Sequence, residues 1–241
     1  MNYMTILEKA HYKFNETSGT DVIDSSGNSN TGTNNGATVN QTGKINKAYS
    51  FDGSNDKVTI SNSTSFDFSD EEYTISIWIK AGSDPRNRNG MIINDGTTTG
   101  TSRKFSIYSR NTDDEIQISV YDSSNNIKQL SYSMTSNYYN LNWINIKIIK
   151  STAGLYVYED TILKDSLIGS FNLVSNTSDK LLGEAGGLYF DGLLDDLRIY
   201  DFALTKKDIN LIYNSGNGTE VDLLTLRNRA DFFSLSLGAE I

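Results

Sequence analysis

The sequence has no cysteine, a single proline and a single histidine among its 241 residues. Without cysteine no disulfide framework can hold the domain, so the chain either folds in a reducing compartment or depends on its core and on bound metal. No stretch is apolar enough to span a bilayer, so we expect no membrane partner.

Basic residues are also few, with 21 Lys and Arg against 30 Asp and Glu and a formal net charge of −9. Because affinity for nucleic acid comes largely from Lys and Arg on phosphates, we expect no nucleic-acid partner, and a cation or a neutral sugar suits the chain better.

Short segments of alternating polarity fill much of the chain. Between Tyr73 and Lys80, isoleucines alternate with Thr, Ser and Trp, which indicates a central strand with bulk on both faces. Similar segments at Glu115–Tyr121 and Trp143–Lys150 follow turns rich in Asp and Asn. We therefore predict a single all-β domain.

The stretch from Phe190 to Tyr213 is the most informative part of the sequence, because its pattern predicts a strand, a turn and one short helix. Thr205, followed three positions later by Asp208, is a variant of the capping box that starts a helix. Two adjacent carboxylates, Asp195 and Asp196, interrupt the strand. Successive strand residues point to opposite faces, so we expect the two to diverge and one of them to face inward or into an edge cleft, beside a cationic group.

These segments occur in the order of a known family's motifs. The segments at Tyr12–Gly19, Ala48–Val58, Tyr73–Lys80 and 190–213 resemble the laminin-G-like branch of the concanavalin-A-like jelly rolls. The resemblance implies a jelly-roll sandwich of two antiparallel sheets over residues 10–216, with one short C-terminal helix. Residues 1–9 are then a lead-in and 217–241 an extension. Trp78 matches the family's core tryptophan, so we expect it to pack in the core rather than to stack on a sugar. The family hosts lectins, adhesion modules and glycoside hydrolases, so the fold alone does not give the function.

The resemblance also implies a structural calcium ion on the convex side of the fold. Matching motif to motif, Asp195 takes the position of the carboxylate ligand, Gly53 that of a backbone carbonyl, and Asp24 that of a second side chain. Calcium suits such oxygen ligands, because it does not demand strict geometry. The alternatives are that Asp195 pairs with Arg198 or caps a backbone amide, and that Asp24 belongs to an ordinary surface loop.

Catalysis is not expected. Glucanases of this family place paired carboxylates on alternating residues of one strand, so that both reach the same glycosidic bond. The nearest acidic group, Asp113 to Glu115, falls in a turn and lacks that spacing. If Asp195 and Asp196 point to opposite faces, they cannot bracket one bond either, and we predict that the chain is not an enzyme.

Candidate ligand-binding residues are Tyr138, Tyr139 and Asp95. Adjacent tyrosines in a polar loop are either a stacking platform for a sugar ring or a hydrophobic corner, and the corner is slightly favoured. Asp95 lies in the irregular polar stretch between residues 81 and 103, and loops of that length are usually functional or mobile. A glycan is the ligand that we expect.

Together these features predict a non-catalytic binding or display module of a virion, such as a capsid decoration, fibre or tail component. The family resemblance, the missing catalytic pair and the absence of a recognisable signal peptide motivate this expectation. The alternative is a secreted or surface carbohydrate-recognition module associated with a glycoside-active protein.

Near the C-terminus, Phe233, Leu235 and Leu237 alternate with serines, which predicts a strand with one apolar face. We expect it to join the sheet edge of a second copy or of another virion protein, although the edge of its own domain is the alternative.

Overall fold

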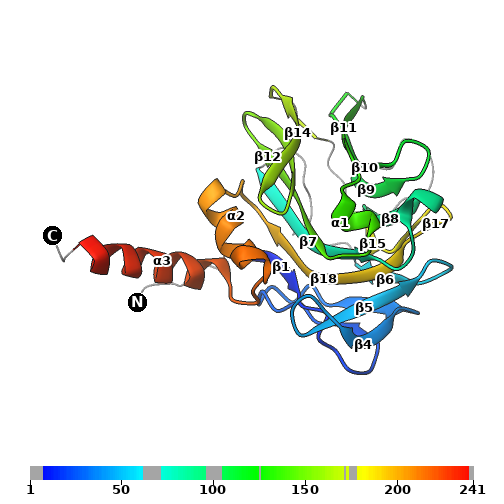
Figure 1. The fold of residues 1–241 in the computed structure, drawn as a ribbon, viewed down its shortest axis with the longest axis horizontal. Helices are drawn as coiled ribbons and strands as arrows, with labels where there is room; N and C mark the ends of the chain where they lie inside the picture. Colours follow the sequence, from blue (N-terminus) through cyan, green and yellow to red (C-terminus); the bar gives the residue numbers. More distant parts are fainter. Residues whose placement is uncertain are drawn as a thin grey trace.

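The computed structural model describes residues 8–61, 72–95, 105–124, 126–170, 172–173 and 178–238, with side chains up to residue 231. Two large antiparallel sheets lie face to face, and their inner faces form one apolar core (Figure 1). The predicted two-sheet jelly-roll sandwich is therefore confirmed. Within the described residues no helix is long and apolar enough to cross a membrane.

Sheet 1 contains the strand that was predicted to be central. Its order is β14-β13-β12-β7-β18-β5-β4, and β1 also pairs with β18. Its strands are β1 (Glu8–Tyr12), β4 (Thr38–Thr42), β5 (Lys47–Asp52), β7 (Tyr73–Ala81), β12 (Ile144–Ser151), β13 (Gly154–Glu159), β14 (Ile162–Ile168) and β18 (Asp191–Tyr200).

Sheet 2 closes the other side of the core. Its order is β11-β10-β9-β8-β15-β6-β3-β2, and a separate small hairpin joins β16 to β17. The strands of sheet 2 are β2 (Asp21–Val22), β3 (Gly32–Asn35), β6 (Lys57–Ile60), β8 (Gly90–Asn94), β9 (Phe105–Arg110), β10 (Glu115–Tyr121), β11 (Ile127–Ser133) and β15 (Lys180–Leu182). The strands of the separate hairpin are β16 (Glu184–Ala185) and β17 (Leu188–Tyr189).

The register of β7 explains the alternation seen in its sequence. Ile75 and Ile77 lie opposite Ile148 and Ile146 of β12, and all four side chains are buried in the core between the sheets. The other face of β7 points away from that core. On it Trp78 is buried by stacking on Tyr213, with ring centroids 5.6 Å apart and 14° between the ring planes. Trp78 is thus a packing residue as predicted, but it packs under a helix rather than between the sheets.

Helix α2 (Lys206–Tyr213) supplies this cover over the outer face of sheet 1. The predicted capping box is present, because the Thr205 hydroxyl accepts from the Asp208 amide and the Asp208 carboxylate accepts from the Thr205 amide. Asn214 follows in the left-handed conformation and ends the helix. The described connections also contain the short helical segments η2 (Pro85–Asn87) and η4 (Asn214–Gly216) and the four-residue α1 (Ser136–Tyr139).

The predicted C-terminal strand is wrong, because residues 223–238 form helix α3 (Leu223–Gly238). Asp222 starts this helix, since its carboxylate accepts from the amide and the hydroxyl of Thr225 at 2.8 Å each. The alternation of Phe233, Leu235 and Leu237 with serine covers only five residues. A helix already nucleated upstream extends cooperatively through so short a pattern. Helix α3 leads away from the sandwich (Figure 1), and the three side chains predicted at an interface lie outside the described side chains.

Candidate functional site

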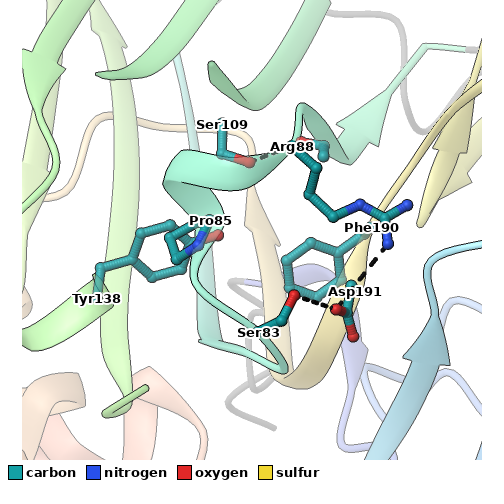
Figure 2. A pocket seen from close by; sticks show the side chains of 8 residues that line it. Ser83, Pro85, Arg88, Ser109, Tyr138, Phe190 and Asp191 are labelled. Atoms are coloured by element: carbon teal, nitrogen blue, oxygen red, sulfur yellow. Dashed lines mark hydrogen bonds and ion pairs between the residues drawn. The ribbon is translucent and has the colours of Figure 1, made fainter. Parts of the chain in front are cut away.

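A small hollow lies at one end of the sandwich, where the loop after β7 meets the first residues of β8 and β18. Its volume is about 10 Å³, which is roughly the space of a single water molecule. Figure 2 shows that the side chains come from several separate elements. The lining residues are Ser83, Pro85, Arg88, Gly90, Ser109, Tyr138, Phe190 and Asp191.

Local backbone chemistry positions the loop that forms one wall of the hollow. Asp84 caps η2 by accepting from the Arg86 amide at 3.0 Å, and Pro85 takes the first helical position. Gly82 allows the chain to pass close to the start of β18, because a Cβ at that position would meet Asp191 Oδ1 at 2.3 Å. The loop is thereby held against β18.

The rim of the hollow combines a guanidinium, a carboxylate and a hydroxyl. Asp191 Oδ2 accepts from the Ser83 hydroxyl at 2.5 Å and lies 3.9 Å from Arg88 Nη1 (Figure 2). Arg88 also donates to the carbonyls of Gly53 and Tyr189. The Arg88 and Asp191 side chains are 37% and 25% exposed, so solvent reaches this pair. Since exposed ion pairs contribute only ~0–1 kcal/mol, ligand hydroxyls could compete for both partners.

The two predicted tyrosines lie here but do different things. Tyr138 is 1% exposed and packs into the core, and burial raises its pKa, so for this residue the hydrophobic corner is the correct alternative. Tyr139 is only partly buried, and the guanidinium carbon of Arg86 lies 4.6 Å from its ring centroid. Arg86 is held in turn by Asp84, with Nη2 to Oδ2 at 2.7 Å. Arg86, whose side chain is 45% exposed, therefore covers the Tyr139 ring, and this pair of planar groups follows Pro85 and Tyr138 of the hollow in sequence.

Asp95 does not belong to this group. It follows Asn94 at the far end of β8, while the hollow is at the Gly90 end, and five strand residues span roughly 17 Å. The Asp95 side chain is 2% exposed and its charge acts on the buried Tyr73 hydroxyl. Sequence reasoning missed Arg88 and Asp191, although the polar composition of the loop after β7 had marked it as a candidate for function.

The closing strand β18 departs from regular geometry at the two adjacent carboxylates. Asp195 lies opposite Trp78 and Arg198 opposite Ser76, so two residues of β18 face one of β7 in a bulge. Asp196 takes a φ of 46°, in the left-handed region. The expectation that the carboxylates point to opposite faces is wrong, because the bulge leaves both on the outer side of sheet 1.

The environments of these carboxylates differ sharply. Asp196 lies beside Arg198 and His11, with Arg198 Nε at 3.1 Å and His11 Nε2 at 2.7 Å, as the expectation of a cationic neighbour required. Burial tends to raise the pKa of Asp196, but the charge of Arg198 holds it below its usual value. Asp195 Oδ2 accepts from the Ile45 amide at 2.8 Å, and Oδ1 is buried with no hydrogen-bond partner among the described residues. Burial raises the pKa of Asp195 to about 8.

The structure does not bring the three predicted metal ligands together. Gly53 follows Asp52, which pairs with Asp191, and Asp195 is four strand residues further along β18, roughly 13 Å away. Asp24 accepts from the amides of His11 and Asn30 at 3.0 Å each. Among the described residues, no group of three His, Cys, Asp or Glu side chains is placed to hold a metal ion. As a set, these residues do not fit the predicted ion, and calcium binding itself stays a prediction.

No pair of carboxylates at the hollow is arranged as a glycosidase requires. Among the described residues that line it, Asp191 is the single acidic one, and two facing carboxyl groups are needed for either stereochemical course of hydrolysis. The turn at Asp113 and Asp114 is exposed, and Glu115 begins β10. The hollow offers hydrogen-bond donors and acceptors for binding.

The two-sheet fold defines the class as a lectin-like jelly roll. The chain belongs to the concanavalin A-like lectin/glucanase superfamily, whose laminin-G type matches residues 52–210. No curated protein matches the chain in sequence.

Solved structures with the same fold include toxin domains. The receptor-binding domain of botulinum neurotoxin C/D mosaic serotype superposes with a TM-score of 0.69 at 18% identity, covering 86% of this chain and 51% of that one. The binding domain of Paraclostridial Mosquitocidal Protein 1 gives 0.70 at 19% identity, covering 87% and 52%. The binding domain of botulinum neurotoxin serotype G gives 0.69 at 15% identity, covering 87% and 51%. This chain thus spans about half the length of those it matches, and at these identities the likeness concerns the fold.

Proposed function

We propose that this chain is a non-catalytic glycan-binding module whose site is the rim formed by Arg88, Asp191 and Ser83. The observation that carries the proposal is the solvent-reached Arg88 and Asp191 pair beside the Arg86 and Tyr139 surface. A sugar hydroxyl both donates and accepts, so it matches a carboxylate and a guanidinium placed side by side. The planar surface next to them suits the apolar face of a sugar ring.

The size of the hollow constrains how a glycan would bind. A space of about 10 Å³ admits no sugar ring, so the ligand would lie across the rim and insert at most one hydroxyl. So shallow a contact buries little area, and the affinity of a single site would be low. Many copies on one particle would raise the overall affinity by avidity, so a shallow site is consistent with a displayed module.

Glycan-array binding tests this function. The chain is coupled to a multivalent carrier and compared with Asp191→Asn and Arg86→Ala, which remove the charged acceptor and the outer guanidinium of the Arg86 and Tyr139 pair. Losing a hydrogen bond to a charged group should weaken binding about tenfold or more. Asp201→Asn is the control, because Asp201 is an exposed acid that pairs with Lys9. No binding by the multivalent wild type, or equal binding by Asp191→Asn and wild type, would refute the site.

The narrower proposal is that the module is a virion component, with the C-terminal segment as its attachment to a second copy or to another virion protein. The departure of α3 from the sandwich supports this, because a helix that leaves its domain needs a partner to bury apolar residues (Figure 1). Mass spectrometry of purified particles tests it. Finding the protein in the culture medium or on the cell surface, and not in particles, would favour the alternative of a carbohydrate-recognition module beside a glycoside-active protein.

A further inference from the structure

The side chain of Arg198 connects three separate stretches of the chain through oxygen atoms. Its Nε lies 3.1 Å from both carboxylate oxygens of Asp196, and Nη1 lies 3.0 Å from Glu8 Oε1. Nη1 also donates to the Val221 carbonyl at 3.0 Å, and Nη2 donates to the Thr219 carbonyl. These acceptors belong to β1, β18 and the segment that leads into α3. The Arg198 side chain is fully buried.

Two carboxylates and two backbone carbonyls are the kind of oxygen set that calcium prefers in proteins. Here the planar guanidinium of Arg198, with its five N–H donors, lies among these oxygens where a metal cation would otherwise bind. Burial tends to lower the pKa of Arg198, but the charge of Asp196 holds it above the usual value, so the positive charge is permanent. His11 adds further donors to the same group, with Nε2 at 2.7 Å from Asp196 Oδ1 and Nδ1 at 3.4 Å from Glu8 Oε2.

The residues expected to bind calcium are occupied in other ways. The Gly53 carbonyl accepts from Arg88, and both oxygens of Asp24 accept from backbone amides. Within the described chain, Asp195 keeps one carboxylate oxygen without a partner. One free oxygen falls far short of the ~6–8 ligands that calcium takes.

We propose that Arg198 takes the place of a structural cation in this protein, joining β1, β18 and the segment before α3, so that folding does not depend on calcium. The geometry supports this role because the same side chain reaches all three stretches. Leu223, the first residue of α3, is fully buried just beyond the two carbonyls that Arg198 holds. The guanidinium therefore also fixes where α3 leaves the domain.

Thermal unfolding of the full chain in calcium chloride and in excess EDTA tests the proposal. Wild type should melt at the same temperature in both. Arg198→Lys keeps the positive charge but loses the planar guanidinium that donates to several acceptors at once. Its Tm should therefore fall by roughly 5 °C or more in both conditions. Arg88→Lys is the matched control, because that arginine is partly exposed, and its Tm should fall less.

A different set of results would overturn the proposal. Calcium would have to raise the Tm of wild type, EDTA would have to reverse the rise, and elemental analysis would have to find a metal that Asp195→Asn removes. If Arg198→Lys does not fold, Glu8→Gln decides, because it removes the charge of one of the two carboxylates that face the same guanidinium. A fall in the Tm of Glu8→Gln that calcium does not restore supports Arg198 as the cation, and an unchanged Tm refutes it.

Discussion

Lys147 gives the sharpest test of the energetics, because it places an amine in a fully buried position on the outer face of sheet 1. Its Nζ donates to Asn145 Oδ1 and, at 2.8 Å, to the Asp160 carbonyl, and it lies 5.5 Å from the centroid of the Tyr213 ring. Burial lowers the pKa of Lys147 from 10.5 to about 7. That difference corresponds to about 5 kcal/mol between the charged and neutral forms.

The sign of the effect follows from proton binding. Between about pH 7 and 10 the unfolded chain holds a proton on Lys147 that the native state has released. The stability that this group contributes therefore rises with pH through that window, and the full cost of burying the ammonium applies below it. Replacing Lys147 by methionine keeps the aliphatic length and removes the titration.

Lys147→Met should be more stable than wild type near pH 6, and this advantage should shrink by up to about 5 kcal/mol near pH 10. Leaving the Asp160 carbonyl unpaired costs ~1–3 kcal/mol at every pH, so the slope and not the offset is the readout. Urea unfolding followed by far-ultraviolet circular dichroism measures it. Lys207→Met, at a side chain that is 59% exposed, is the control for the pH dependence. A Lys147→Met difference as flat with pH as that of the control would refute the reasoning.

Three further outcomes are expected. Ile148→Ala, in the core between the sheets, should lower the free energy of unfolding by ~2–5 kcal/mol in urea denaturation, and a loss below 1 kcal/mol would contradict the packing. Incubation with laminarin, agar or chitin should release no reducing ends, and release that an Asp191→Asn variant abolishes would show that the chain is an enzyme. Truncation after Asp231 should leave a folded monomer by light scattering, while truncation after Gly218 should destabilise the domain because it removes Leu223 and the carbonyls held by Arg198.

Local and periodic features of the fold were predictable from the sequence. The alternation of isoleucine with other residues in β7 predicted a strand, because a regular strand turns every second side chain toward the core. Bulky side chains on its other face, such as Trp78, indicated that the strand is central. The start of α2 was predictable for the same kind of reason, since a capping box is a contact between residues three apart. Helix α3 was missed because five alternating residues were read in isolation from the capped helix that precedes them.

The candidate site was less accessible to sequence reasoning, because its parts are distant along the chain. Ser83 and Arg88 come from the loop after β7, whereas Asp191 begins β18 and meets them only in the folded sandwich. Of the adjacent tyrosines, Tyr138 lines the hollow, and ligand binding by the pair stays a prediction. Their roles could not be separated, since only packing shows that Tyr138 points into the core and Tyr139 toward Arg86.

The paired carboxylates of β18 show most clearly where a local rule fails. Alternation places Asp195 and Asp196 on opposite faces only while the strand stays regular, and one left-handed residue cancels that rule. A non-glycine residue in this conformation costs ~1–3 kcal/mol and persists when its surroundings compensate. Arg198 and His11 provide that compensation, because turning Asp196 outward lets its carboxylate pair with a guanidinium from β18 and an imidazole from β1. The bulge and the Arg198 contacts therefore depend on each other, and Asp196→Gly, which relaxes the backbone but removes the carboxylate, should destabilise the domain in spite of the better backbone fit. Unfolding in urea would decide the matter, since a glycine variant more stable than wild type would show that backbone strain outweighs the charge contacts.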